Sequence, residues 1–151
     1  METENPENEK PLRNARRMGI LFLTYAIVFP FITLIVPEIE SPVGTASIML
    51  SWLMMFLMPV EILLIYVLYR FLGNRFGLSN FQGLAVLMYM FAIVPSVYAF
   101  VIGFTDSSLR STAILLGLAF SLTGFSLALR LLSNHWDAIT TNNQYSTDQL
   151  E

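Results

Sequence analysis

Residues 81–104 read FQGLAVLMYMFAIVPSVYAFVIGF, and none of these side chains carries a formal charge. The hydrocarbon core of a bilayer is about 30 Å thick and a helix rises 1.5 Å per residue, so about 20 apolar residues are needed to cross it. A run of this length is too long for a strand of a soluble sheet. Lipid also requires the backbone groups of a segment to bond within that segment, which favours a helix. This stretch therefore predicts a transmembrane helix.

Three further stretches have a similar length and composition, at residues 18–36, 47–69 and 112–132. The links between the four are short, and short links make consecutive helices antiparallel neighbours. The first stretch is longer than the apolar part of a signal peptide, about 7–15 residues, so we expect it to be retained. The sequence predicts an all-α integral membrane protein, an antiparallel, up-down four-helix transmembrane bundle over residues 18–132.

The composition agrees with this fold class. Of the 151 residues, 55% are hydrophobic and 13% are charged, whereas a soluble domain carries about 25% charged residues. High hydrophobicity also argues against intrinsic disorder. The chain has no cysteine, which excludes disulfide scaffolds, thiolate zinc sites and cysteine nucleophiles.

Positive charges indicate the orientation of the helices, because cytoplasmic loops carry an excess of Lys and Arg. In the predicted bundle seven basic residues fall on one side of the membrane, and the other side holds only Arg110. We therefore expect both termini in the cytoplasm, with the chain in the cell membrane. The side chains expected to contact lipid head groups are Arg13, Arg16, Arg17, Arg70, Arg75 and Arg130.

The two ends of the chain are polar. Residues 1–17 are acidic and then basic, and residues 133–151 are rich in polar side chains. Segments with so few apolar residues do not pack well, so we expect two flexible cytoplasmic tails.

Small residues recur along the third and fourth predicted helices. Helices associate in a membrane through close packing of small residues and through interhelical hydrogen bonds. We expect these two helices to pack tightly along this seam; lining a ligand or ion path is the alternative role. The seam residues are Ala85, Ala92, Ala99 and Gly103 in the third helix, and Ala113, Gly117, Ser121, Gly124 and Ala128 in the fourth.

The second predicted helix has the opposite character. Between residues 52 and 72 it contains no Gly, Ala, Ser or Thr, and it includes the soft run Met-Met-Phe-Leu-Met at residues 54–58. Methionine-rich surfaces adapt to many partners. Two interpretations are open for this helix: contact with lipid, or a surface for a partner helix.

Glu61 is the only carboxylate well inside a predicted span, about 12 Å from its cytoplasmic end. A charged acid near the bilayer centre costs at least about 2.5–3.5 kcal/mol, so it must take up a proton or find a donor on another helix. The preferred donors are Tyr89, Ser96 and Ser121, chosen from a wider set of candidates that also includes Thr24, Tyr25, Tyr98 and Thr123. Three roles are open for Glu61: fixing helix register, binding a proton or cation, or meeting a charge of a partner subunit.

The sequence contains few residues or motifs that support catalysis. The only histidine, His135, is expected at a solvated helix end, and the chain has no G-x-S-x-G, no H-E-x-x-H and no phosphate-binding glycine loop. We expect no catalytic residue, cofactor, metal or nucleic-acid partner. The leading interpretation is an accessory or scaffold subunit whose partners are the lipid bilayer and other membrane subunits or a second copy. The alternative is a small oligomeric proton- or cation-coupled transporter or channel that uses Glu61.

Overall fold

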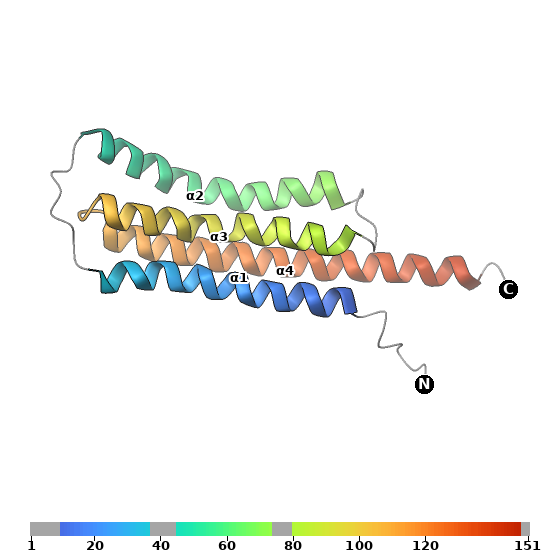
Figure 1. Cartoon of the computed structure of the whole chain (residues 1–151). Coiled ribbons are helices and arrows are strands. Elements are labelled where there is room, and N and C mark those ends of the chain that lie inside the picture. The colour runs from blue at the N-terminus through green and yellow to red at the C-terminus, as the bar shows by residue number, and fades with distance from the viewer. Residues whose placement is uncertain (1–9, 37–44, 74–79, 149–151) are drawn as a thin grey trace.

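The computed structural model describes residues 10–36, 45–73 and 80–148, and these residues form four long helices (Figure 1). The all-helical fold class is confirmed. The four are α1 (Lys10–Ile35), α2 (Thr45–Leu72), α3 (Phe81–Thr105) and α4 (Arg110–Asp148). Each contains a segment that is long and apolar enough to cross a membrane. The arrangement is consistent with a four-helix bundle in a membrane.

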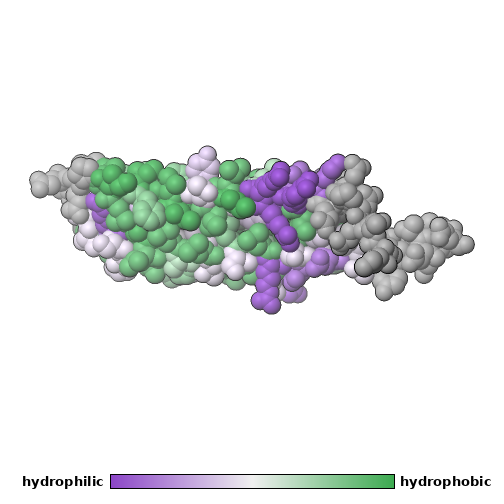
Figure 2. All heavy atoms as spheres, turned by 90° about the horizontal axis from the view of Figure 1, so that it is seen from below, coloured by the Kyte–Doolittle hydropathy of each residue, from purple (hydrophilic) through white to green (hydrophobic). Residues whose placement is uncertain are grey.

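The central pair of the bundle is α3 and α4, which make the most extensive contact between any two helices. α1 and α2 flank this pair on opposite sides (Figure 1), and each packs against both central helices. The face that includes α1 is apolar over most of its length, with hydrophilic side chains gathered toward the end where α1 begins (Figure 2). This distribution suits a helix that enters the hydrocarbon core from a polar interface.

Close approach of α3 and α4 depends on glycine. A Cβ atom added at Gly117 would overlap the Cβ atom of Ala99 and lie 2.8 Å from the carbonyl oxygen of Pro95. A Cβ atom at Gly124 would lie 3.3 Å from Ala92. All nine seam residues are buried: Ala85, Ala92, Ala99, Gly103, Ala113, Gly117, Ser121, Gly124 and Ala128.

α1 docks on α3 in the same way, through one glycine on each helix. A Cβ atom at Gly103 of α3 would overlap the side chain of Thr33, and one at Gly19 of α1 would lie 2.8 Å from the ring of Tyr89. The end of α1 is also joined to the start of α4, because an Nη atom of Arg110 donates a hydrogen bond to the Val36 carbonyl at 2.7 Å.

Two helices extend beyond their predicted bounds by two turns or more, whereas α2 and α3 differ from theirs by one to three residues. α1 begins at Lys10 rather than at residue 18, and α4 continues to Asp148 rather than ending near residue 132. The structure thus places residues 10–17 and 133–148 in helices rather than in the expected tails, while residues 1–9 and 149–151 lie outside the described part. The length of an apolar stretch indicates only the part of a helix that lies inside lipid. Polar turns of the same helix can continue where water solvates their side chains.

Packing also explains these extensions. Ala15 of α1 is buried in the main apolar cluster, together with Phe81 and Trp136. The rings of Phe81 and Trp136 have centroids 5.1 Å apart. The added turns of α1 and α4 therefore bury apolar surface, which stabilises them.

The prediction for His135 is wrong. The side chain is buried, with 8% of its surface exposed. Its ring stacks on Phe81 at a centroid distance of 6.3 Å and meets the edge of Tyr69 at 5.9 Å. Because α4 continues past residue 132, His135 falls three residues after buried Leu132 and so on the same helix face. It belongs to an aromatic cluster.

Asp106 holds the turn between α3 and α4. Its Oδ1 atom accepts hydrogen bonds from the N–H groups of Ser108 at 3.0 Å and Leu109 at 3.3 Å, and from the Ser108 hydroxyl at 2.6 Å. A side-chain oxygen that accepts from the N–H group two residues ahead forms an Asx turn, which here lies directly before α4.

Candidate functional site

Glu61 of α2 is buried, with 9% of its surface exposed. Its Oε1 atom accepts a hydrogen bond of 3.1 Å from the hydroxyl of Tyr98 on α3. Within α2 the neighbours three and four positions away are apolar, so the helix itself offers no partner. The contact with Tyr98 therefore ties α2 to α3.

The second oxygen of this carboxyl group is not satisfied. Oε2 of Glu61 is buried and has no hydrogen-bond partner among the described residues. A buried polar atom without a partner is costly and calls for an explanation. Glu61 therefore has one oxygen engaged with Tyr98 and one oxygen open to a proton, a cation, a water or a partner.

Ser96 and Ser121 form a second polar contact, between α3 and α4. The Ser96 hydroxyl donates to Oγ of Ser121 at 2.8 Å, and the Ser96 N–H donates to the same oxygen at 3.1 Å. Both residues are fully buried. Ser96 directly follows Pro95, which lacks an N–H group and so removes one backbone hydrogen bond from α3. The pair adds interhelical hydrogen bonds at that weakened turn.

α3 holds both polar contacts on different sides. Ser96 and Tyr98 are two positions apart, which separates their side chains by about 200° around a helix. Ser96 therefore meets α4 while Tyr98 meets α2.

The structure pairs Glu61 with Tyr98, one of the wider set of candidate donors, rather than with the three preferred ones. Ser96 and Ser121 bond to each other. Tyr89 lies under Gly19 of α1, and its hydroxyl has no hydrogen-bond partner in the described part of the chain. Membrane depth alone gives several tyrosines and serines as candidates; choosing Tyr98 requires knowing which face of α3 meets α2.

α2 divides into a narrow inner stripe and a wide outer face. Its buried residues are Ser51, Met58, Glu61 and Ile65, and Oγ of Ser51, like Oε2 of Glu61, has no partner among the described residues. The opposite face carries bulky exposed side chains, which we call the α2 outer row. Its members are Met49, Trp52, Phe56, Leu63 and Phe71.

Of the basic residues expected at lipid head groups, those of α1 lie near its start and Arg70 lies near the end of α2, whereas Arg130 lies in the middle of α4. Five of them are exposed: Arg13, Arg16, Arg17, Arg70 and Arg130. Arg75 lies outside the described residues. Of the five, Arg16 also forms part of the wall of a cavity between α1, α3 and α4.

The described residues contain no group of three or more His, Asp or Glu side chains that could hold a metal ion. Glu61 with Tyr98, and Ser96 with Ser121, are thus the side-chain pairs that hydrogen-bond between helices in this part of the chain; Ser51, Tyr89, Asp106 and His135 are also buried. No protein-family model matches the chain, and no curated protein or solved structure is significantly similar to it.

Proposed function

We propose that this chain is a non-catalytic multi-pass membrane protein that serves as an accessory or scaffold subunit, with the α2 outer row as its contact with a partner. The observation that carries the proposal is the contrast within the bundle. α3 and α4 bury their small residues against each other, whereas α2 exposes large aromatic and aliphatic side chains such as Trp52 and Phe56. Large aromatic side chains dominate the energetics of protein interfaces.

The polar groups of the core support a structural role for α3 and α4. The serine pair joins α3 to α4, and Tyr98 joins α3 to Glu61 of α2. Each of these contacts fixes the rotation of one helix against another. A rigid central pair can then present α2 in one orientation.

Blue-native electrophoresis after gentle solubilisation tests the proposal. We expect the wild-type chain to migrate in a complex, and the double variant Phe56→Ala, Leu63→Ala to migrate as a monomer. The matched control replaces two equally exposed side chains on other helices, Leu21→Ala and Leu115→Ala, and retains the complex. A wild-type chain that migrates only as a lone monomer contradicts the proposal. Two differently tagged copies show whether the partner is a second copy.

The proposed orientation is an antiparallel bundle in the cell membrane with both termini in the cytoplasm. It follows from the positive charges near the start of α1 and the end of α2, and from Arg130 at the end of the apolar part of α4. Because the chain lacks cysteine, single substitutions give clean labels. In intact cells a membrane-impermeant maleimide is expected to label Ser107→Cys, in the exposed α3–α4 turn, and to spare Asn134→Cys. The reverse pattern contradicts this orientation.

A second candidate function rests on the open Oε2 atom of Glu61. In this alternative the chain is a small oligomeric transporter or channel, and Glu61 binds and releases a proton or a cation. Flux into liposomes is the test, with the wild-type chain compared with Glu61→Gln. Flux that the substitution abolishes supports this function; flux that is unchanged, or absent from both, ends it.

A further inference from the structure

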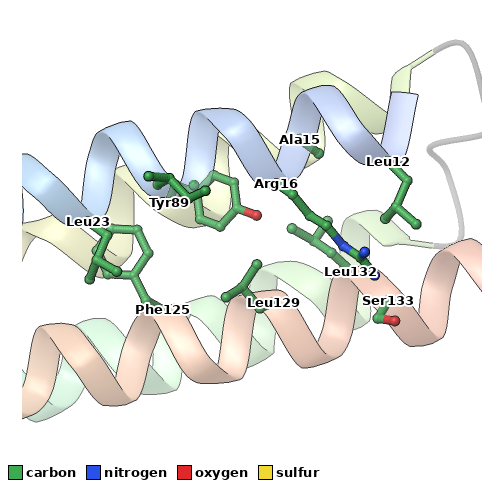
Figure 3. A pocket seen from close by; sticks show the side chains of 11 residues that line it. Leu12, Ala15, Arg16, Leu23, Tyr89, Phe125, Leu129, Leu132 and Ser133 are labelled. Atoms are coloured by element: carbon green, nitrogen blue, oxygen red, sulfur yellow. The ribbon is translucent and has the colours of Figure 1, made fainter. Parts of the chain in front are cut away.

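A cavity lies between α1, α3 and α4 toward the end of the molecule where α1 begins (Figure 3). Its volume is about 360 Å³, within the range of about 300–1,000 Å³ typical of small-molecule sites. Its wall is formed by residues of α1 between 12 and 23, by Tyr89 of α3, and by residues of α4 between 125 and 133. Neither Glu61 nor the serine pair belongs to it.

The polar groups of the wall are gathered at one end. Leu23 and Phe125 lie at the other end, while Arg16 and Ser133 lie beside Leu12 and Leu132 (Figure 3). The distance along α1 from Arg16 to Leu23 is about 10 Å, about two-thirds of one leaflet of a 30 Å hydrocarbon core. No acidic residue is among those that line the cavity in the described chain. The polar and apolar side chains are therefore distributed along the cavity as they are along a lipid, and the cationic side chain of Arg16 lies where the head group would be.

Tyr89 supplies an unsatisfied donor inside this cavity. The residue is fully buried, and its hydroxyl has no hydrogen-bond partner among the described residues. Gly19 lets the ring lie against α1, since a Cβ atom there would be 2.8 Å from it. The hydroxyl points toward the end of the cavity that holds Arg16 (Figure 3). The Tyr89 hydroxyl is therefore available to donate a hydrogen bond to a molecule in the cavity.

Two wall residues, one on α1 and one on α4, are exposed: Ile20 at 64% and Leu129 at 41%. Their exposure indicates that the cavity opens to the surface between these two helices. In a bilayer, an acyl chain can enter through such an opening without crossing water.

We propose that this cavity binds one anionic phospholipid. One acyl chain lies between α1 and α4, the phosphate pairs with Arg16, and an oxygen of the head-group region accepts a hydrogen bond from Tyr89. Basic pockets between transmembrane helices bind anionic head groups on the cytoplasmic side. A free phosphate would leave the apolar end of the cavity unused, which is why we commit to a lipid. The inference does not depend on the accessory role proposed above.

Native mass spectrometry of the full chain in mild detergent tests the charge pairing. The probes are phosphatidylglycerol and phosphatidylcholine with identical acyl chains, and we expect retention of one phosphatidylglycerol molecule in preference to phosphatidylcholine. Arg16→Gln is expected to lower this preference about fivefold, the effect of one arginine near an anionic surface. Arg13 is an exposed arginine of the same helix outside the cavity. Because its head-group contacts are with the surrounding bilayer and not with the retained lipid, Arg13→Gln is expected to lower the preference much less than Arg16→Gln.

Two further variants test the tyrosine and the acyl chain. Tyr89→Phe keeps the ring and is expected to lower phosphatidylglycerol retention about threefold. Ile20→Trp places a large ring at the opening and is expected to abolish retention. Its matched control is Leu21→Trp, because Leu21 is 61% exposed but lies outside the cavity wall. Equal melting temperatures of the two tryptophan variants exclude misfolding as the cause.

Three results would overturn the proposal. Equal losses in Arg16→Gln and Arg13→Gln would mean that surface charge alone attracts the lipid. Competition by inorganic phosphate as strong as that by phosphatidylglycerol would mean an anion site without an acyl chain. Equal retention of the two phospholipids by the wild-type chain would mean no selective site.

Discussion

The α3–α4 seam and α2 cross the same kind of environment with opposite side chains. In the seam, glycine, alanine and serine let two backbones approach so closely that a Cβ atom at Gly117 has no room. α2 has few small side chains and meets its neighbours through Met58, Glu61 and Ile65, leaving its outer row exposed. In a membrane, helices approach closely where their facing residues are small. The seam thus brings α3 and α4 together, and the exposed outer row of α2 is the surface that we propose for a partner.

The largest loss of stability is expected from a larger side chain in the seam. Gly117→Val forces a side chain against Ala99 and the Pro95 backbone, and we expect it to destabilise the bundle by about 3 kcal/mol or to prevent folding. Gly83→Val is the matched control, because Gly83 is on α3 and nothing lies within 4 Å of its Cβ position. Thermal unfolding in detergent, followed by circular dichroism, measures both. Similar melting temperatures for the two variants would contradict the packing described for the seam.

A smaller effect is expected at the serine pair. Ser121→Ala leaves the buried N–H and hydroxyl of Ser96 without their shared acceptor, and we expect a loss of about 1 kcal/mol. Ser96→Ala is expected to lose less, because the N–H of residue 96 still donates to Oγ of Ser121. The double variant is expected to lose less than the sum, because the two side chains share the same hydrogen bond. Additive losses would show that the serines act independently.

The contact between α2 and α3 is expected to behave differently. Glu61→Leu together with Tyr98→Phe removes both hydrogen-bonding groups and also removes the open oxygen of the acid, so the melting temperature is expected to stay the same or to rise. Glu61→Leu alone leaves the tyrosine hydroxyl without its partner and is expected to gain less. A large loss of stability in the double variant would show that Glu61 is needed for the fold and weaken the case for a functional acid.

The smallest effect on stability is expected at the α2 outer row. Phe56→Ala with Leu63→Ala changes only exposed side chains, and we expect a change in unfolding free energy within about 0.5 kcal/mol. The same thermal unfolding experiment measures it. A loss comparable to that of Gly117→Val would mean that this face supports the monomer rather than a partner.

Much of the fold could be predicted from the sequence, because lipid reduces the choice of spanning structures to helices of known length. The four apolar stretches correspond to α1, α2, α3 and α4. What length could not give was where a helix ends outside lipid: the turns before residue 18 and after residue 132 depend on contacts such as that between Phe81 and Trp136. His135 was misjudged for the same reason.

The site was predictable only in part. Glu61 stood out because an acid inside an apolar span is costly, and that argument needs no structure. Selecting Tyr98 among the candidate donors for Glu61 required the structure. Tyr89 and Tyr98 are both tyrosines of the same helix, and the difference between them is the face on which each lies: Tyr89 meets α1 and Tyr98 meets α2.

Photocrosslinking in intact membranes tests the central claim most directly. A photoreactive amino acid is placed at Phe56 of the α2 outer row, or at Leu115 of α4, which is exposed to a similar degree. We predict a discrete protein adduct from position 56 and only lipid adducts from position 115. Lipid adducts alone from both positions, or the same protein adduct from both, would contradict the claim that α2 is the face reserved for a partner.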